Sequence, residues 1–425
     1  MTPEGREALP LALAGLVLAA LVAFLLTPVA ARLAVKVGAI DRPGERRVHH
    51  EATPRGGGLA VAAAFVVVGL GVLVFQRRQD LVPLGLRPPP RELAGLFLGA
   101  GLAAAFGFVD DRFDLRARWQ FLAQAVLALV AIVSGMTIGF VNNPFGSGII
   151  SITGVFALGF TAFWIIGMVN AINWIDGLDG LSTGIAMIAA LTLGGISLTA
   201  TPTQPVVAIL CLTMAGSLAG FLPWNFHPAR IFVGTTGVFL IGYTLAVLSL
   251  LGTAKVAVAL LVLGVPIIDA FWIIVRRLAR GASPFAPDRG HLHHRLLDLG
   301  LSHRAAVLVI YGICTLLAIL SFRLSGTGQL YAFLGIVVAS GVVLYLLTTR
   351  AGDTSVTGLA AHAYDAPNGD AAVSAGPPSA ARTPRTSPTG SRPAPVVDAH
   401  PMPRTDAAGR GMPPAGQTGG PVGPR

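Results

Sequence analysis

Charged side chains are scarce in this sequence. Asp, Glu, Lys and Arg make up 12% of the 425 residues, whereas hydrophobic residues make up 53%. The mean hydropathy is +0.71. Soluble globular domains contain about 25% charged residues. This composition excludes an ordinary soluble protein and indicates an integral membrane protein.

Cysteine is also scarce, with only Cys211 and Cys314, both inside apolar runs. This excludes a disulfide framework and a cysteine-based metal site, and both residues are expected to be small buried hydrophobic side chains. The net charge of +10 raises the alternative of nucleic-acid binding. Because the arginines lie in short loops between apolar runs and in the C-terminal region, orientation in a membrane explains them better. No nucleic-acid partner is expected.

Apolar runs recur along the chain, each long enough to cross about 30 Å of hydrocarbon. Helices satisfy their own backbone hydrogen bonds in lipid, so each run is expected to be a helix. The first run is too long for a signal peptide and is expected to remain as a span. The sequence therefore predicts an all-α integral membrane protein, a polytopic bundle of about 11 transmembrane helices. The predicted spans are 9–35, 57–75, 92–109, 118–135, 154–174, 181–199, 205–224, 236–252, 255–275, 304–322 and 328–348.

The distribution of Lys and Arg predicts the orientation of this bundle. Loops 36–56, 110–118, 225–230 and 276–304 contain 15 of these residues, and the loops on the opposite side contain six. Positively charged loops remain in the cytoplasm. We therefore expect a multi-pass plasma-membrane protein with its N-terminus outside and its C-terminus in the cytoplasm. Loop 76–91 is an exception, because it places four arginines outside.

The composition changes near residue 350, where Pro, Ala, Gly, Thr and Ser replace the aliphatic residues. Such a segment cannot bury enough apolar surface to offset its chain entropy. We expect a membrane catalytic domain over 1–350 and a disordered Pro/Ala/Gly-rich cytoplasmic tail over 351–425.

Carboxylate and amide side chains gather in the predicted cytoplasmic loops. Asn170, Asn173, Asp176 and Asp179 recur every third residue, so a helix continuing through them would place all four on one flank. The adjacent pair at positions 110 and 111 follows the third span. Paired carboxylates either bind a divalent cation or shift each other's pKa. A solvated helix end remains an alternative for both stretches.

This one-sided clustering bears on the class of function. A transporter would place polar groups near the middle of the bilayer. Polar groups on the cytoplasmic side favour chemistry between a cytosolic substrate and a lipid. Ligand atoms that are all oxygen suit Mg²⁺, with Mn²⁺ as the alternative.

A histidine motif follows the ninth span. His291, His293 and His294 form a His-x-His-His sequence, flanked by Arg289 and Arg295. Neither a cysteine nor a fourth clustered ligand accompanies the histidines, which disfavours zinc. The residues are expected to form a cationic cradle for a phosphate or diphosphate.

These three stretches together resemble the polyprenyl-phosphate N-acetylhexosamine-1-phosphate transferase family, glycosyltransferase family 4. The likeness covers roughly residues 10–348 and is greatest for the GlcNAc-1-phosphate branch. It implies transfer of a sugar-1-phosphate, most directly GlcNAc-1-phosphate, from a UDP-amino sugar to a polyprenyl phosphate. UMP would be released, in the first membrane step of cell-envelope polysaccharide synthesis. The resemblance leaves a homodimer open.

The resemblance also implies roles for individual residues. The catalytic residues would be Asp110, Asp111, His293 and His294. Asn173 and Asp176 would bind the metal. The substrate-binding residues would be Asn170, Asp176, Asp179, Arg289, His291, Arg295, Arg47 and His49.

One position departs from the family pattern. The family has Gly-Asp-x-Gly-Ser where this chain has Gly234-Thr235-Thr236-Gly237-Val238, so Thr235 stands at the family's metal-binding Asp. A neutral hydroxyl is a poorer Mg²⁺ ligand than a carboxylate. Two hypotheses follow: an active transferase, or a weakly active or inactive relative that binds polyprenyl phosphate or a partner. Release of UMP by the purified protein separates them.

Overall fold

A computed structural model describes residues 2–41, 52–79, 88–143, 146, 148–251, 256–279, 281, 291–324 and 326–342. These residues belong to one compact unit, Met1–Leu359. The predicted tail over 351–425 lies outside the described residues, as do Arg47, His49 and Arg289.

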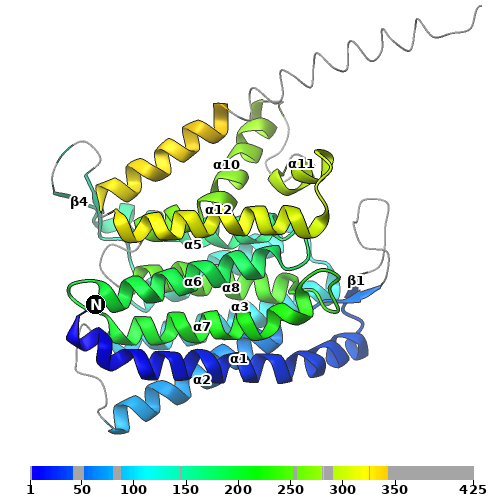
Figure 1. Cartoon of the computed structure of the whole chain (residues 1–425), viewed down its shortest axis with the longest axis horizontal. Helices are drawn as coiled ribbons and strands as arrows, with labels where there is room; N and C mark the ends of the chain where they lie inside the picture. The colour runs from blue at the N-terminus through cyan, green and yellow to red at the C-terminus, as the bar shows by residue number, and fades with distance from the viewer. Residues whose placement is uncertain are drawn as a thin grey trace, which may run out of the picture. The chain divides into compact units, whose positions relative to one another are not determined.

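The described chain is mostly helical, as Figure 1 shows. Its helices are α1 (Pro3–Val37), α2 (Gly58–Gln79), α3 (Pro90–Phe113), α4 (Ala117–Val133), α5 (Gly154–Ile175), α6 (Leu181–Thr199), α7 (Pro205–Asn225), α8 (Gly234–Leu250), α9 (Val256–Val262), α10 (Gly264–Ala279), α11 (Leu292–Asp298) and α12 (His303–Arg323). Another helix covers Thr327–Val342. Two short antiparallel hairpins pair β1 (Ile40–Asp41) with β2 (Thr53–Pro54), and β3 (Phe140–Asn142) with β4 (Ile149–Ser151). The sequence did not predict these hairpins.

The helices have the lengths and composition of membrane spans. Among the described residues, seven are long and apolar enough to cross a membrane, or eight if the bent pair α9–α10 is one span. Three shorter apolar helices are α4, α8 and Thr327–Val342. Large apolar side chains on the outside of α1, such as Leu25 at 60% exposed, fit contact with lipid. The all-α membrane class is confirmed, and eleven crossings remain a prediction.

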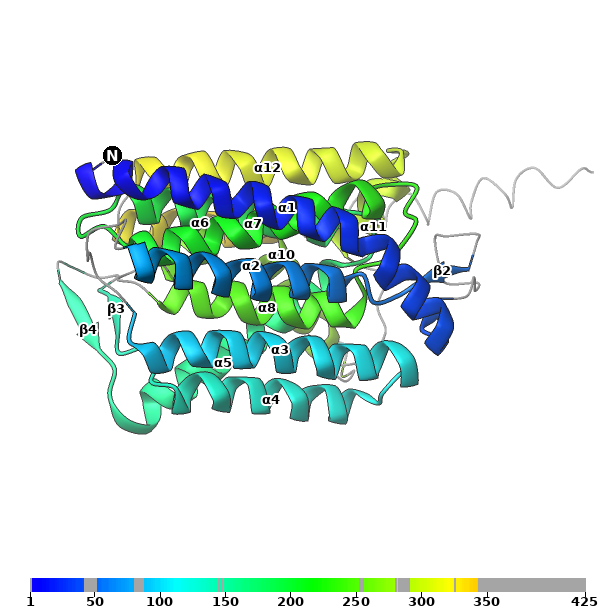
Figure 2. The same ribbon diagram turned by 90° about the horizontal axis from the view of Figure 1, so that it is seen from below.

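Helices α7 and α8 form the centre of the bundle. Every residue of α8 from Thr236 to Ser249 is buried. Helix α7 packs against α1, which lies beside it in both views (Figures 1 and 2). A Cβ on Gly216 would lie 2.1 Å from the Leu16 carbonyl oxygen, so only glycine permits this approach. Small residues let helix backbones meet closely in lipid.

The ninth predicted span, 255–275, is wrong as one straight helix. The chain forms α9 and α10 instead, with an angle of 77° between them. Pro266 lies in the first turn of α10 and has no amide hydrogen to donate to the preceding turn. Gly264 at the break adds backbone freedom. Pro266 and Gly264 together account for the bend.

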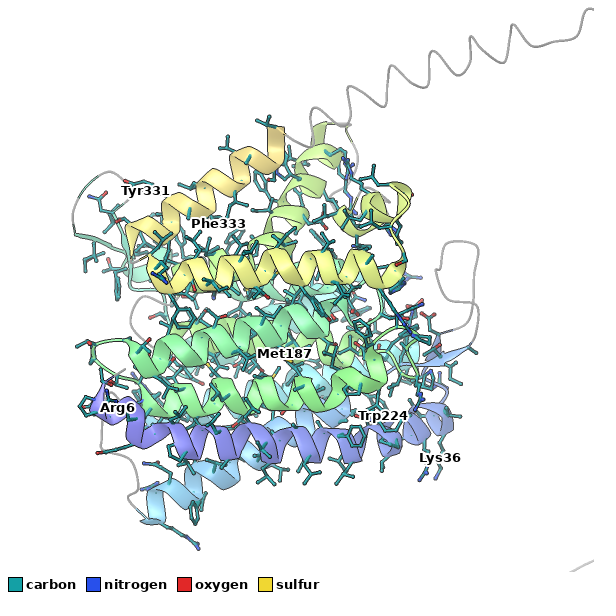
Figure 3. The ribbon with its side chains drawn as sticks, viewed as in Figure 1. Arg6, Lys36, Met187, Trp224, Tyr331 and Phe333 are labelled. Atoms are coloured by element: carbon teal, nitrogen blue, oxygen red, sulfur yellow. The ribbon has the colours of Figure 1, made fainter. Side chains whose placement is uncertain are left out.

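The two ends of the bundle differ in content. The β1–β2 hairpin and α11 lie at one end, and the start of α1 and the β3–β4 hairpin lie at the other (Figures 1 and 2). Figure 3 shows Arg6 at the second end, and Lys36 and Trp224 at the first. The polar loops meet at the first end, around the cavity described next.

Candidate active site

A cavity of about 610 Å³ opens at this end of the bundle. Residues from six separate parts of the chain line it, so the fold brings together most of the polar clusters. Its charged and polar lining residues include Asp41, Arg55, Asp111, Asn173, Asp176, Asp179, Asn225, His227, Thr235, His294 and His303.

Asp111, near the C-terminal end of α3, fixes the start of α8. Its carboxylate accepts hydrogen bonds from the Thr235 amide (2.8 Å), the Thr236 amide (3.0 Å) and the Thr236 hydroxyl (2.5 Å). The first amides of a helix have no partner within the helix, and a carboxylate there also meets the positive end of the helix dipole. The side chain is only 6% exposed. Asp111 is therefore both a cavity wall and a helix cap.

The Asp110 carboxylate also accepts three hydrogen bonds. Its Oδ2 accepts from the Thr235 hydroxyl at 2.7 Å, and its Oδ1 accepts from the Gln120 side chain at 2.9 Å and the Leu115 amide at 3.1 Å. Unlike Asp111, Asp110 is not among the residues that line the cavity. The solvated helix end proposed for this pair is therefore wrong, because both side chains are buried and bonded.

Gly234 makes the contact between α3 and α8 possible. Its φ of +68° lies in the left-handed region. A Cβ there would lie 2.4 Å from the Asp111 Oδ2 atom. Any side chain at this position would strain the backbone and displace the carboxylate.

The stretch from Asn170 to Asp179 is not one helix, which corrects the expectation of a shared flank. Helix α5 ends at Ile175, and Gly180, with φ of +80°, precedes α6. Asn173 lines the cavity from the last turn of α5, and Asp176 and Asp179 line it from the loop that follows. Asn170 instead points at α4, where its amide donates to the Gln124 side chain at 2.6 Å. It is not among the residues that line the cavity.

Asp176 lies in the loop between α5 and α6. Its Oδ1 accepts a hydrogen bond of 2.6 Å from the Ser182 hydroxyl. Burial of the carboxyl group, together with the negative charges of Asp111 and Asp179, raises the pKa of Asp176 to about 7. A carboxylate crowded by two others is stabilised by a bound cation.

The three histidines of the motif, at the start of α11, have different surroundings. His291 Nδ1 lies 2.8 Å from the Asp269 carboxylate of α10, and only His294 lines the cavity. His293 is 1% exposed, and a Cβ on Gly177 would lie 2.1 Å from its Nε2 atom. Burial, together with the charges of the neighbouring histidines, lowers the pKa of His293 to about 3. Arg295 lies on α11.

The structure adds residues that the sequence-based site omits. Asp269 holds both His291 and the Leu292 amide, the latter at 2.8 Å. Arg55 lines the cavity and pairs with Asp41 at 3.0 Å. A lone acid inside the apolar run 255–275 was a signal for Asp269. Arg55 shares loop 36–56 with three other arginines, so its residue type alone did not single it out.

Comparison with known proteins decides the family. Residues 93–253 match glycosyl transferase family 4. A probable undecaprenyl-phosphate N-acetylglucosaminyl 1-phosphate transferase of Bacillus subtilis is 38% identical over 302 residues, covering 68% of this chain and 78% of the relative. This chain belongs to glycosyl transferase family 4.

Other members of family 4 are similar over most of their length. Decaprenyl-phosphate N-acetylglucosaminephosphotransferase of Mycolicibacterium smegmatis is 34% identical, covering 81% of this chain and 90% of the relative. Undecaprenyl-phosphate alpha-N-acetylglucosaminyl 1-phosphate transferase of Thermotoga maritima is 33% identical, covering 76% and 94%. The resemblance drawn from the three motifs is confirmed, and this family 4 protein is an enzyme of the phosphotransferase type.

Proposed function

We propose that the protein transfers GlcNAc-1-phosphate from UDP-GlcNAc to a polyprenyl phosphate and releases UMP. The observation that carries this proposal is the cavity that joins Asn173, Asp176 and Asp179 to Asp111, Arg55 and His294. The names of the relatives support the acceptor lipid and the transferred group.

The reaction exchanges one phosphoanhydride for another. An oxygen of the lipid phosphate attacks the sugar-linked phosphorus of the donor, forming the new P–O bond. The bond from that phosphorus to the bridging oxygen breaks, and UMP leaves with this oxygen. The protein's work in such a transfer is to position the phosphates and neutralise their charge.

Asn173 and Asp176 are the residues that would hold Mg²⁺, or Mn²⁺ in its place. The donor set fits, because both residues offer oxygen and line the same cavity as Asp111 and Asp179. The ion would offset phosphate charge at the reacting phosphorus. Thr235 fits less well, because its hydroxyl proton is directed at Asp110. It retains only a neutral oxygen for the metal.

The cationic residues at the cavity would bind the phosphates of the donor and acceptor. Arg55 is held in place by Asp41, and its guanidinium can make paired hydrogen bonds to phosphate. His294 faces the same cavity from α11. Asp269 orients the histidine motif through His291. The positive-inside distribution of Lys and Arg supports a site on the cytoplasmic face.

The test is UMP release by the purified full-length protein with UDP-GlcNAc, a polyprenyl phosphate and Mg²⁺. We expect turnover that requires both substrates and falls at least a hundredfold in Asp176→Asn, since the variant loses the charge that holds the metal. Asp114→Asn is the control, because Asp114 is exposed and does not line the cavity. A folded wild type that binds polyprenyl phosphate but releases no UMP would support the inactive relative instead.

A further inference from the structure

A second cluster of metal-ligand type lies at the edge of the same cavity. Asp179 (the α5–α6 loop), His227 (the loop after α7) and His303 (the first residue of α12) each offer one ligand atom. These atoms all lie within 4.8 Å of one another. Three separate elements therefore bring their ligand atoms close together.

The hydrogen bonds of this cluster leave donor atoms for a ligand. Asp179 Oδ2 lies 2.8 Å from His227 Nδ1 and accepts from the Ala229 amide at 3.1 Å. His303 differs, because both its ring nitrogens are buried and neither has a hydrogen-bond partner among the described residues. A buried polar atom without a partner is costly, so a ligand that bonds to it is stabilising.

A hydrogen bond beside the cluster joins two of its elements. The Arg304 side chain donates a hydrogen bond of 3.1 Å to the His227 carbonyl oxygen, which ties α12 to the loop after α7. Residues that orient the ligands of a metal are a regular part of such sites.

We propose that Asp179, His227 and His303 bind a transition-metal ion of the Zn²⁺ class. Two imidazoles and one carboxylate suit Zn²⁺ far better than Mg²⁺, which prefers oxygen ligands and water. Three protein ligands leave a fourth coordination position, as in zinc sites that bind substrate or water. All three residues line the cavity, so that position would be open to it.

Binding requires a small rearrangement of the rings. The imidazoles of His227 and His303 are stacked, with centroids 4.1 Å apart and an angle of 17° between the planes. Nearly parallel rings do not aim two nitrogens at one ion, so one ring must turn about its Cβ–Cγ bond. That torsion is broad and inexpensive to change. Metal binding should therefore replace the ring stack with convergent ligands.

Metal binding to the purified full-length protein, without a polyhistidine tag, tests the proposal. After removal of metals with EDTA, the protein is dialysed against Zn²⁺ in detergent and its metal content is measured. We expect one Zn²⁺ per chain in the wild type, and affinity at least tenfold lower in His227→Asn and in His303→Asn. Excess Mg²⁺ should not displace the ion. This readout is independent of transferase activity, so it stands or falls separately from the proposed reaction.

His294→Asn is the matched control, because His294 lines the same cavity from outside the cluster. It should bind Zn²⁺ like the wild type. Co²⁺ added to the wild type provides a measurement without mutation, since Co²⁺ in a four-coordinate protein site has much stronger visible absorption bands than hydrated Co²⁺. The proposal is overturned if the wild type binds no more Zn²⁺ than the His227→Asn/His303→Asn double variant, or shows no Co²⁺ bands. It is also overturned if His294→Asn loses the ion, which would locate binding at the histidine motif.

Discussion

The Thr235 hydroxyl donates a hydrogen bond of 2.7 Å to the Asp110 carboxylate. The family pattern has an aspartate at position 235, and a carboxylate cannot donate in this way. This chain therefore has a hydrogen bond where the family pattern would place two negative charges side by side. Asp110 is stabilised without a metal ion.

Substitutions at Thr235 should show this effect directly. Thr235→Val removes the donor and should cost about 1.5–3 kcal/mol, the usual value for a hydrogen bond to a charged group. Thr235→Ser keeps the donor and should remain near the wild type. Thr235→Asp should lower the melting temperature without Mg²⁺ and recover when Mg²⁺ is added, because a cation relieves the repulsion. Thermal unfolding in detergent, with and without Mg²⁺, measures all three variants.

Activity in the same series separates the two hypotheses about this position. If Asp176 and its neighbours supply enough charge for the metal, the wild type releases UMP, and Thr235→Asp changes the Mg²⁺ requirement only modestly. We expect this result. A Thr235→Asp protein more stable than the wild type in the absence of Mg²⁺ would contradict the role assigned to the hydrogen bond.

Asp111 should be important for both stability and turnover. In Asp111→Asn the side chain loses its charge at the start of α8 and one of its two acceptor oxygens. We expect a loss of about 1–2 kcal/mol, as for other helix caps, and turnover reduced at least a hundredfold. The exposed Asp114→Asn is again the control. Unchanged melting temperature and UMP release in Asp111→Asn would refute both roles.

The sequence predicted most of the polar residues of the site, but not which of them line the cavity. Two carboxylates at 110 and 111 were expected to work as a pair, yet Asp111 lines the cavity and Asp110 does not. Asn170 and Asn173 both lie on α5, but only Asn173 lines the cavity, and the end of α5 at Ile175 breaks the period before Asp176. Such differences depend on where helices end and on neighbours far away in the chain, such as Gln124. Local patterns do not contain this information.

The bend between α9 and α10 shows a similar limit. Gly264 and Pro266 were visible in the sequence, but hydropathy favours one continuous span through them. Asp269 lies on α10, after the bend, where its carboxylate contacts His291. A lone acid in an apolar run predicts a functional position. It does not identify the partner.

His293 should make the protein sensitive to acid. Its pKa is about 3 in the folded state, against about 6.5 in an unfolded chain. Between these values the unfolded state binds the extra proton, so stability falls as the pH decreases below about 6.5 and is constant above it. Melting temperatures at pH 8 and pH 5 should differ less in His293→Leu than in the wild type. Equal pH dependence in the two proteins would rule out His293 as the cause.

The proposed orientation can be tested with cysteine labelling, because Cys211 and Cys314 are buried and give little background. Arg116 lies at the cavity end of the bundle and Glu7 at the other end, and both residues are exposed. Each is replaced by cysteine in turn, as Arg116→Cys and Glu7→Cys. In intact cells a membrane-impermeant maleimide should label Glu7→Cys only, and after permeabilisation it should label both. Labelling of Arg116→Cys from outside would invert the predicted topology.

The backbone around the cavity constrains how this protein can be redesigned. The Gly57 and Gly58 amides donate hydrogen bonds of 2.9 Å to the Phe232 and Val233 carbonyl oxygens, and the Phe232 amide donates to Pro54. These bonds join the segment that carries Arg55 to the segment that leads into Thr235. A chimaera that takes residues 231–238 from a relative must therefore take 54–58 from the same parent, or the two halves of the site will no longer align.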